Sequence, residues 1–334
     1  MTRAKRIGLM LWPTPGLEAG FDRGVWAEEN GYDDLWLPDG EGLQDLIAFA
    51  AALGVATSRI RLCTGIVPVF TRPPATLATA TVAAEQRAPG RFVLGLGAST
   101  QNMIGRWYGL SYERPLTRVR ETVALLREIF TGDKSDFTGV TVRSQGFRLQ
   151  ERPTAPIPIY LAALGAKMLQ LCGEIADGVV LNDFTPPDRL GWALEQIDTG
   201  AKRRGRRVDE LEIVKRYAIL VTDDEPDALE FFRRYLAVYA SAPPYQQILT
   251  ELGYGDAVAT IRAGYKDRNR ARITAACSKA IAKRLFAFGP APVCRAALNR
   301  EFDAGIDTAV VSPQARDAAE FARGATAFLG ERRA

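Results

Sequence analysis

The chain has 334 residues, of which 47% are hydrophobic, and this is enough apolar content to fill one large α/β core. Its 43 basic and 39 acidic residues leave a formal net charge of only +4, a bias too small to indicate nucleic-acid binding. No apolar run approaches the roughly 20 residues of a membrane span, and the basic start leads straight into a strand, so we expect a cytoplasmic protein with a small-molecule substrate and no membrane partner.

The predicted elements alternate between strand and helix almost from end to end. Apolar runs of strand length occupy residues 7–12, 34–37, 60–68, 91–99, 157–163, 178–182, 211–222 and 308–312. Helical spacing of apolar residues occupies 17–30, 45–56, 74–87, 118–130, 166–175, 188–204, 226–239, 255–264, 273–285 and 316–329. Eight strands with helices between them predict an α/β fold, a single (β/α)8 TIM barrel over residues 1–334, rather than an open doubly wound sheet.

Two segments interrupt this alternation. Residues 133–156 are polar and rich in turn formers, so we expect an insertion there that forms a small hairpin. Residues 241–292 contain less regular helical pieces, and we expect a second insertion that folds over the active face.

The ends of the predicted strands are the most informative positions, because the loops that follow the strands form the active face of a barrel. The strands at 60–68 and 91–99 both end in glycine, proline, serine and threonine. The other strand ends are also rich in small residues and poor in charge. Such a rim suits a large flat cofactor contacted through the backbone, and it predicts no metal site.

The chain contains no histidine. This excludes Ser-His-Asp and Cys-His catalysis, most zinc sites, and the commonest general acid or base at neutral pH. Its four cysteines form no Cys-x-x-Cys pair and are expected to be buried thiols. Any proton transfer therefore depends on Asp, Glu, Lys, Tyr, Cys or water.

Two long blocks of the sequence carry a family resemblance. The first runs from Thr64-Gly65-Ile66-Val67-Pro68 through Thr71-Arg72-Pro73-Pro74 to the strand at 90–97, and the second covers 158–182. Both resemble the luciferase-like flavin and deazaflavin oxidoreductases. The second block is most similar to the branch that uses coenzyme F420, which includes methylenetetrahydromethanopterin reductase. The resemblance extends over essentially the whole chain.

The resemblance implies a bulge at the end of the third strand, with a non-prolyl cis peptide bond that backs the deazaflavin ring. By position this bond is Gly65–Ile66. Without the resemblance, Gly65 would be interpreted only as relieving crowding in a barrel strand.

The resemblance also implies a set of coenzyme-binding residues. A glycine at the turn before a helix exposes backbone N–H groups at the positive helix end, which is an anion site, so Gly165 is expected to hold the coenzyme's phosphate. Asp39 follows the second strand, where similar enzymes contact the coenzyme, although a helix cap or surface position is the alternative. The full expected set is Asp39, Thr64, Gly65, Ile66, Val67, Pro68, Ala98, Ser99, Thr100, Asn102, Leu164, Gly165, Ala166, Lys167 and Met168.

Departures from the family pattern bear on the substrate. Many relatives carry a histidine where this chain has Gly40, and the sugar-phosphate dehydrogenase branch carries a glutamate where this chain has Thr100. Because oxidation of an alcohol leaves a proton to remove, their absence argues against such dehydrogenases and favours an iminium-like carbon or an activated C=C bond. The catalytic candidates are Glu41, Tyr108 and Asp183, with a loop carboxylate, barrel-end packing and a helix cap as their respective alternatives.

These observations predict a coenzyme F420-dependent oxidoreductase that transfers a hydride between C5 of the deazaflavin and a small organic substrate. The alternatives are an FMN-dependent monooxygenase of the same superfamily and a barrel that binds a flavin or deazaflavin without turnover. Because relatives are commonly dimers, we also expect a homodimer.

Overall fold

The computed structural model describes residues 3–12, 20–40 and 42–329. The strands are β1 (Arg6–Met10), β2 (Asp34–Leu37), β3 (Arg61–Thr64), β4 (Val67–Pro68), β5 (Phe92–Gly97), β6 (Asp136–Thr138), β7 (Arg143–Gln145), β8 (Ile159–Ala162), β9 (Gly178–Leu181), β10 (Glu212–Val221), β11 (Ala287–Gly289) and β12 (Thr308–Pro313). The helices are α1 (Gly20–Glu29), α2 (Leu46–Ala56), α3 (Pro74–Glu85), α4 (Pro115–Phe130), α5 (Ala166–Ile175), α6 (Pro187–Lys202), α7 (Glu225–Tyr239), α8 (Pro243–Glu251), α9 (Gly255–Lys266), α10 (Arg270–Ala276), α11 (Lys279–Leu285), α12 (Ala291–Asp303) and α13 (Ala318–Thr326), with a π-helical turn at Met103–Trp107 and a 3-10 turn at Val208–Glu210.

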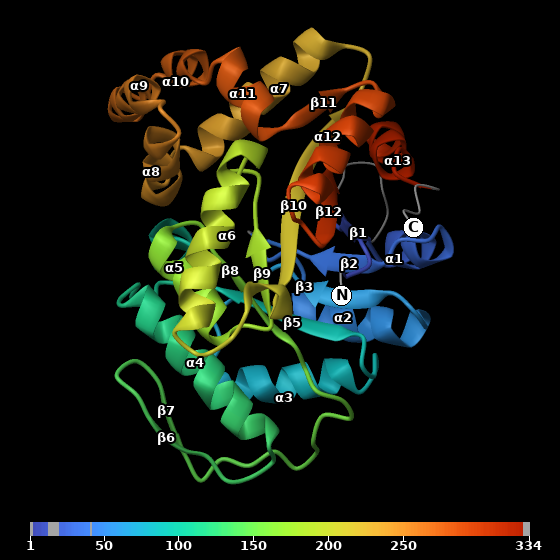
Figure 1. Ribbon diagram of the computed structural model, residues 1–334, viewed down its shortest axis with the longest axis vertical. Helices are drawn as coiled ribbons and strands as arrows, with labels where there is room; N and C mark the ends of the chain where they lie inside the picture. The colour runs from blue at the N-terminus through green and yellow to red at the C-terminus, as the bar shows by residue number, and fades with distance from the viewer. Residues whose placement is uncertain (1–2, 13–19, 41, 330–334) are drawn as a thin grey trace.

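The central feature is a closed barrel of parallel strands, in the order β1, β2, β3, β5, β8, β9, β10, β12 and back to β1. Each of these strands lies where the sequence predicts one, so the TIM-barrel prediction is confirmed. Helices surround the barrel (Figure 1), and residues 133–156 include the antiparallel hairpin β6–β7. Among the described helices, none has both the length and the apolarity needed to cross a membrane.

Strand β10 is the longest strand of the sheet and continues beyond the barrel. It pairs with β9 from Glu212, with β12 from Val214 and with β11 from Ile219. The sequence analysis missed β11, which is only three residues long. The chain between β10 and β11 forms helices α7 to α11, which we call the helical excursion (residues 225–285) and which stands beyond one end of the barrel at the upper left of Figure 1.

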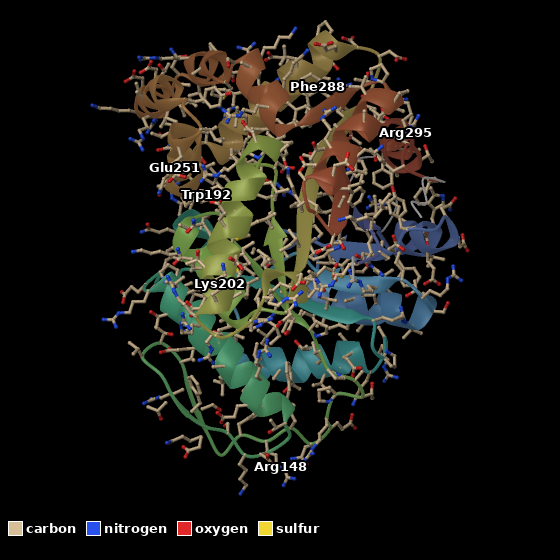
Figure 2. All side chains as sticks on the ribbon, viewed as in Figure 1. Arg148, Trp192, Lys202, Glu251, Phe288 and Arg295 are labelled. Atoms are coloured by element: carbon tan, nitrogen blue, oxygen red, sulfur yellow. The ribbon has the colours of Figure 1, made fainter. Side chains whose placement is uncertain are left out.

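The helical excursion packs around a second hydrophobic cluster, which is separate from the core between the barrel and its helices. Phe232 of α7 belongs to this cluster, and so do residues just outside the excursion, such as Phe184 after β9 and Phe286 before β11. Polar contacts also attach the excursion to the barrel helices. Arg189 of α6 forms an ion pair with Glu251 of α8 and lies 4.0 Å from the ring centre of Trp192; Figure 2 shows Glu251 and Trp192 close together at this junction.

Inside the barrel, side chains that alternate along the strands form an apolar layer. This layer consists of Met10, Trp36, Cys63, Val93, Tyr160, Val214 and Val310. The side chains between them in sequence point outward to the helices, as expected for parallel strands that are buried on both faces. The layer therefore closes the middle of the barrel.

A network of charged and polar side chains seals the amino-terminal end of the barrel; we call it the polar plug (Arg6, Asp34, Arg61, Tyr160, Glu212 and Thr308). Asp34 is fully buried and accepts hydrogen bonds from Arg61 Nε and Nη2, both at 2.7 Å, and from Arg6 Nη2 at 2.5 Å. Arg61 also binds Glu212, with Nη2 at 2.7 Å from Oε1. Because this end is closed by satisfied charges, the opposite end is the one available for a functional site.

The plug gives the protein a predicted acid sensitivity. Burial acts to raise the pKa of Glu212, but hydrogen bonds from Arg61, Thr308 and Tyr160 outweigh it and lower that pKa from 4.5 to about 2. A carboxylate with a lowered folded-state pKa stabilises the fold above its unfolded-state pKa, so we expect about 3 kcal/mol to be lost as the pH falls from 4.5 to about 2. Urea unfolding at a series of pH values measures this loss. Glu212→Gln should be less stable at neutral pH and should lack this component, and an unchanged acid dependence in that variant would contradict the assignment.

Candidate functional site

A bulge interrupts the third barrel strand between β3 and β4. The peptide bond between Gly65 and Ile66 in this bulge is cis, at the position where the sequence analysis expects it. Thr64 Oγ1 donates to the carbonyl of Gly95 at 2.9 Å and accepts from the N–H of Gly95 at 2.7 Å, while Gly65 N donates to Leu37 O at 2.7 Å. Both neighbouring strands therefore hold the bulge in place.

Glycines are required around the bulge because the backbones approach closely. A Cβ atom on Gly95 would lie 2.0 Å from the carbonyl oxygen of Thr64, and one on Gly97 would lie 2.9 Å from Cδ1 of Ile66. A Cβ on Gly65 would lie 3.1 Å from the ring of Trp36. We call Gly65, Ile66, Gly95 and Gly97 the glycine platform. Gly95 and Gly97 are buried, and the half-buried Gly65 and Ile66 leave backbone and one aliphatic side chain accessible, which suits contact with a planar ring.

The rim segment that follows β5 contains Ala98, Ser99, Thr100 and Asn102. Ser99 has a φ of 61°, in the left-handed region, and its carbonyl accepts a hydrogen bond from Tyr112 Oη at 3.0 Å. The Tyr112 ring in turn packs against Phe70, which follows β4, with 5.0 Å between ring centres. These contacts fix the rim segment beside the glycine platform.

The turn from β8 into α5 has the features of an anion site. Gly165 is the N-cap of this ten-residue helix, makes no side-chain cap, and has no atom within 4 Å of where a Cβ would lie. Within the described residues, no hydrogen bond uses the N–H groups of Ala166 or Lys167, and the Lys167 side chain is exposed. Leu164 and Met168 are half-buried on either side of the turn. Free N–H groups at a helix N-terminus beside a lysine suit a phosphate.

A second group of charges lies after β2. Asp39 is half-buried, and burial raises its pKa although the charge of Arg72 acts in the opposite direction. Arg72 forms an ion pair with Asp45, whose carboxylate also caps α2. Tyr108 is 42% exposed, and burial followed by the charge of Asp39 raises its pKa, so Tyr108 and Asp39 lie near one another.

Asp183, which follows β9, is fully buried and both of its oxygen atoms have partners. Oδ2 forms an ion pair with Arg216 of β10, and Oδ1 accepts the N–H of Ala218 at 2.6 Å. Arg216 Nη1 also donates to Tyr239 Oη at 3.2 Å. Asp183 therefore orients the guanidinium of Arg216, and its role in catalysis stays a prediction.

The predicted site residues gather at one end of the barrel. Asp39, the bulge, the rim segment, Gly165 and Asp183 follow β2, β3, β5, β8 and β9, which are consecutive neighbours in the sheet. Glu41 lies outside the described residues. In the described ranges, no group of His, Cys, Asp and Glu side chains could hold a metal ion.

Sequence reasoning missed three residues at this end of the barrel, Arg72, Asp45 and Arg216. Arg72 lies within the motif that carried the family resemblance, so its position after a strand was a usable signal. Arg216 could have been found from strand alternation, because it lies two residues after the inward-facing Val214. Its ion pair with Asp183 spans 33 residues and leaves no local sequence signal.

Comparison with known proteins agrees with this geometry. The family model described as "Luciferase-like monooxygenase" matches residues 8–308. The chain is 32% identical to a 5,10-methylenetetrahydromethanopterin reductase from Archaeoglobus fulgidus, over 71% of this chain and 70% of that protein. It is 33% identical to the same-named enzyme from Methanolobus tindarius, over 60% of each chain. The coenzyme F420-dependent tetrahydromethanopterin reductase from Methanopyrus kandleri has the same fold, with a TM-score of 0.81, 98% of each chain covered and 21% identity.

Proposed function

The chain belongs to the luciferase-like monooxygenase family, and within that family we propose that it is a coenzyme F420-dependent oxidoreductase. It transfers a hydride between C5 of the deazaflavin and a small organic substrate. The relatives support the enzyme class and the coenzyme, since the similar curated proteins include two reductases and two enzymes named as F420-dependent.

The observation that carries the proposal is the glycine platform at the bulge. Gly95 and Gly97 leave no room for side chains beside the Gly65–Ile66 bond, and the uncapped N-terminus of α5 lies two strands further along the same barrel edge. A flat ring on the platform and an anionic tail at Gly165 match the shape and charge of a deazaflavin with a phosphate. When bound, the coenzyme supplies a hydride donor or acceptor, while the chain supplies orientation.

The chain's other residues complete this arrangement. Ala98, Ser99, Thr100 and Asn102 line the rim next to the platform. Thr64 holds the amino-terminal side of the bulge, and Val67 and Pro68 hold its carboxyl-terminal side by pairing with β5. Asp39, with its raised pKa, and the nearby Tyr108 are two further polar groups of the described rim that can meet the coenzyme or substrate. Arg72 is held by Asp45 and balances the charge of Asp39.

The substrate class follows from the available acids and bases. The chain has no histidine, and both oxygens of Asp183 already have partners. Reduction of an iminium-like carbon needs only a hydride, and reduction of an activated C=C bond can take its proton from water. These substrates fit the site better than a sugar phosphate, whose oxidation requires a base.

Parallel titrations with coenzyme F420 and with FMN test the proposal. We expect coenzyme F420 to quench tryptophan fluorescence at micromolar concentrations, and FMN to bind far more weakly. Tight binding of FMN without binding of coenzyme F420 would favour the alternative of an FMN-dependent monooxygenase. Bound, reduced coenzyme that fails to react with any enone, imine or carbonyl in a broad panel would favour a barrel that binds the coenzyme without turnover.

We also propose a homodimer that forms through the outer faces of α2 and α3. Helix α2 contains no charged residue, and its exposed residues are Ala48, Ala52, Val55 and Ala56, with Val55 75% exposed. The exposed residues of α3 are Thr76, Thr79 and Ala83, also uncharged. A contiguous uncharged surface over two neighbouring helices is typical of a subunit interface.

Four free, buried cysteines agree with the reducing environment of the cytoplasm, where we place the protein.

Replacement of Val55 by glutamate is expected to convert the dimer to a monomer, because it places a charge on the most exposed apolar side chain of this surface. Light scattering after size-exclusion chromatography measures the mass of each species. Val238→Glu is the matched control, since Val238 is 70% exposed on α7, away from α2 and α3. A wild-type protein that is monomeric, or a Val55→Glu variant that stays dimeric, would contradict this interface.

A further inference from the structure

Arg216 is a charged side chain in the inward-facing row of β10. In this row, Glu212 belongs to the polar plug and Val214 to the apolar layer inside the barrel. Arg216 comes next, one level closer to the carboxyl ends of the strands. Alternation along the strand therefore places its side chain above the apolar layer, on the side of the barrel where the candidate site lies.

The guanidinium of Arg216 has hydrogen-bond donors that the described residues leave unused. Nη2 binds Asp183 and Nη1 binds Tyr239, whereas Nε is buried and has no partner within the described part of the chain. The side chain is 12% exposed and Nε itself is buried, so the group is largely removed from bulk water. A desolvated donor without an acceptor is unfavourable, and an acceptor from a bound molecule would satisfy it.

The surroundings of Arg216 fix both its charge and its position. Burial acts to lower the pKa of Arg216, but the charge of Asp183 outweighs it and holds that pKa well above the ordinary value. Arg216 therefore stays a cation and cannot serve as a proton donor. The Asp183 carboxylate holds Nη2, and the Tyr239 ring, 5.6 Å from the guanidinium carbon, covers one side.

We propose that Arg216 binds the carbonyl oxygen of an α,β-unsaturated carbonyl substrate and stabilises the negative charge that forms there. This inference rests on the proposed function and assigns the substrate class of the same site. Because Asp183 balances the charge of Arg216, the pair favours a neutral carbonyl over a substrate carboxylate. Asp183 and Tyr239 act as positioning residues for Arg216.

The electron balance of this reduction needs no histidine. Hydride from C5 forms a new C–H bond at the β-carbon, and the C=C electron pair shifts to give an enolate whose oxygen carries the charge. The α-carbon then takes a proton from water, so the substrate gains two electrons and the coenzyme loses two. Fixed N–H donors at a developing oxyanion are worth about 100-fold or more in rate.

Binding of 4-nitrophenolate to the protein without coenzyme tests the oxyanion site directly. The phenolate mimics the enolate oxygen, and its absorbance reports whether the bound molecule is ionised. We expect Arg216→Gln to weaken phenolate binding about tenfold and to shift bound 4-nitrophenol toward its neutral form. Arg216→Lys should give an intermediate result, because it keeps the charge and loses the planar donors. Equal affinity for the phenolate in wild-type and Arg216→Gln proteins would overturn the proposal.

The matched control is Arg233→Gln. Arg233 lies on α7, the helix that follows β10. Arg233 Nε donates to Cys277 O at 2.9 Å, entirely within the helical excursion, so its loss perturbs the excursion without touching the barrel mouth. We expect Arg233→Gln to bind the phenolate as the wild type does. Equal weakening in both arginine variants would overturn the proposal, because it would assign Arg216 a structural role only.

Reduction of cyclohex-2-enone by the reduced coenzyme supplies the kinetic test. We expect Arg216→Gln to lower kcat about 100-fold with unchanged affinity for coenzyme F420, and to lose less rate with a more electrophilic nitroalkene. Failure of the wild type to bind coenzyme F420 would refute the proposed function. Normal coenzyme binding and enone reduction in both the wild type and Arg216→Gln would refute only the role of Arg216.

Discussion

Replacement of Gly95 by alanine is expected to abolish binding of coenzyme F420, with a loss of affinity of about 100-fold or more. The new Cβ would lie 2.0 Å from the carbonyl oxygen of Thr64, and this neighbour is backbone, which cannot rotate away. The bulge must then move, and the mutual hydrogen bonds between Thr64 and Gly95 are lost with it. Fluorescence titration with the coenzyme measures the affinity, and circular dichroism checks that the barrel remains folded.

Gly191→Ala is the control for this substitution. Gly191 lies on the exposed side of α6 with no atom within 4 Å of its Cβ position, so alanine should leave coenzyme binding unchanged and raise the stability of the helix by about 0.5–1 kcal/mol. A Gly95→Ala variant that is folded and binds the coenzyme as the wild type does would show that the glycine platform is not part of the coenzyme site.

Replacement of Asp34 by alanine is expected to lower the free energy of unfolding by about 3–5 kcal/mol. Asp34 is fully buried and balances Arg6 and Arg61 at the closed end of the barrel. Without it, Glu212 is the remaining carboxylate of the polar plug for two half-buried cationic groups, and the desolvation of Arg61 is compensated only in part. Urea unfolding at neutral pH, followed by circular dichroism, measures the change.

Asp209→Ala is the control, because it removes an ion pair that is exposed to solvent. Asp209 binds Arg207 at the surface, where solvent screens the interaction, and its removal should leave stability unchanged within error. If Asp34→Ala also left the stability unchanged, the polar plug would contribute nothing to the fold. Binding of coenzyme F420 by folded Asp34→Ala protein should stay normal, since the plug lies at the opposite end of the barrel.

Sequence reasoning placed the barrel strands correctly because each strand is buried on both faces. Such strands are rich in apolar residues, and Phe92–Gly97 is a continuous apolar run that stands out against its polar flanks. The hairpin β6–β7 was indicated by turn residues. Strand β11 was missed because three residues, Ala287 to Gly289, give no periodic signal, and it is specified by its pairing with the far end of β10.

The candidate site was predicted where it depends on the backbone and missed where it depends on contacts between distant side chains. Gly65, Gly97 and Gly165 are visible in the sequence as glycines at strand ends, and the close approaches at Gly65 and Gly97 favour glycine there. The partnership of Asp183 with Arg216 and that of Asp45 with Arg72 form only when separate strands are brought side by side. The catalytic candidates stay predictions: Tyr108 lies by Asp39, and Asp183 has two protein partners.

The separate hydrophobic core of the helical excursion has a consequence for how this enzyme could change over evolution. Phe232 and its neighbours pack in a cluster that includes residues of β10 and β11 but none of β3 or β5, and the excursion is one continuous insertion between β10 and β11. Its side chains can therefore diverge without disturbing the glycine platform, which lies on β3 and β5. Because Tyr239, on α7, covers one side of Arg216, substitutions in the excursion would change which substrates bind, while the residues that hold the coenzyme stay the same.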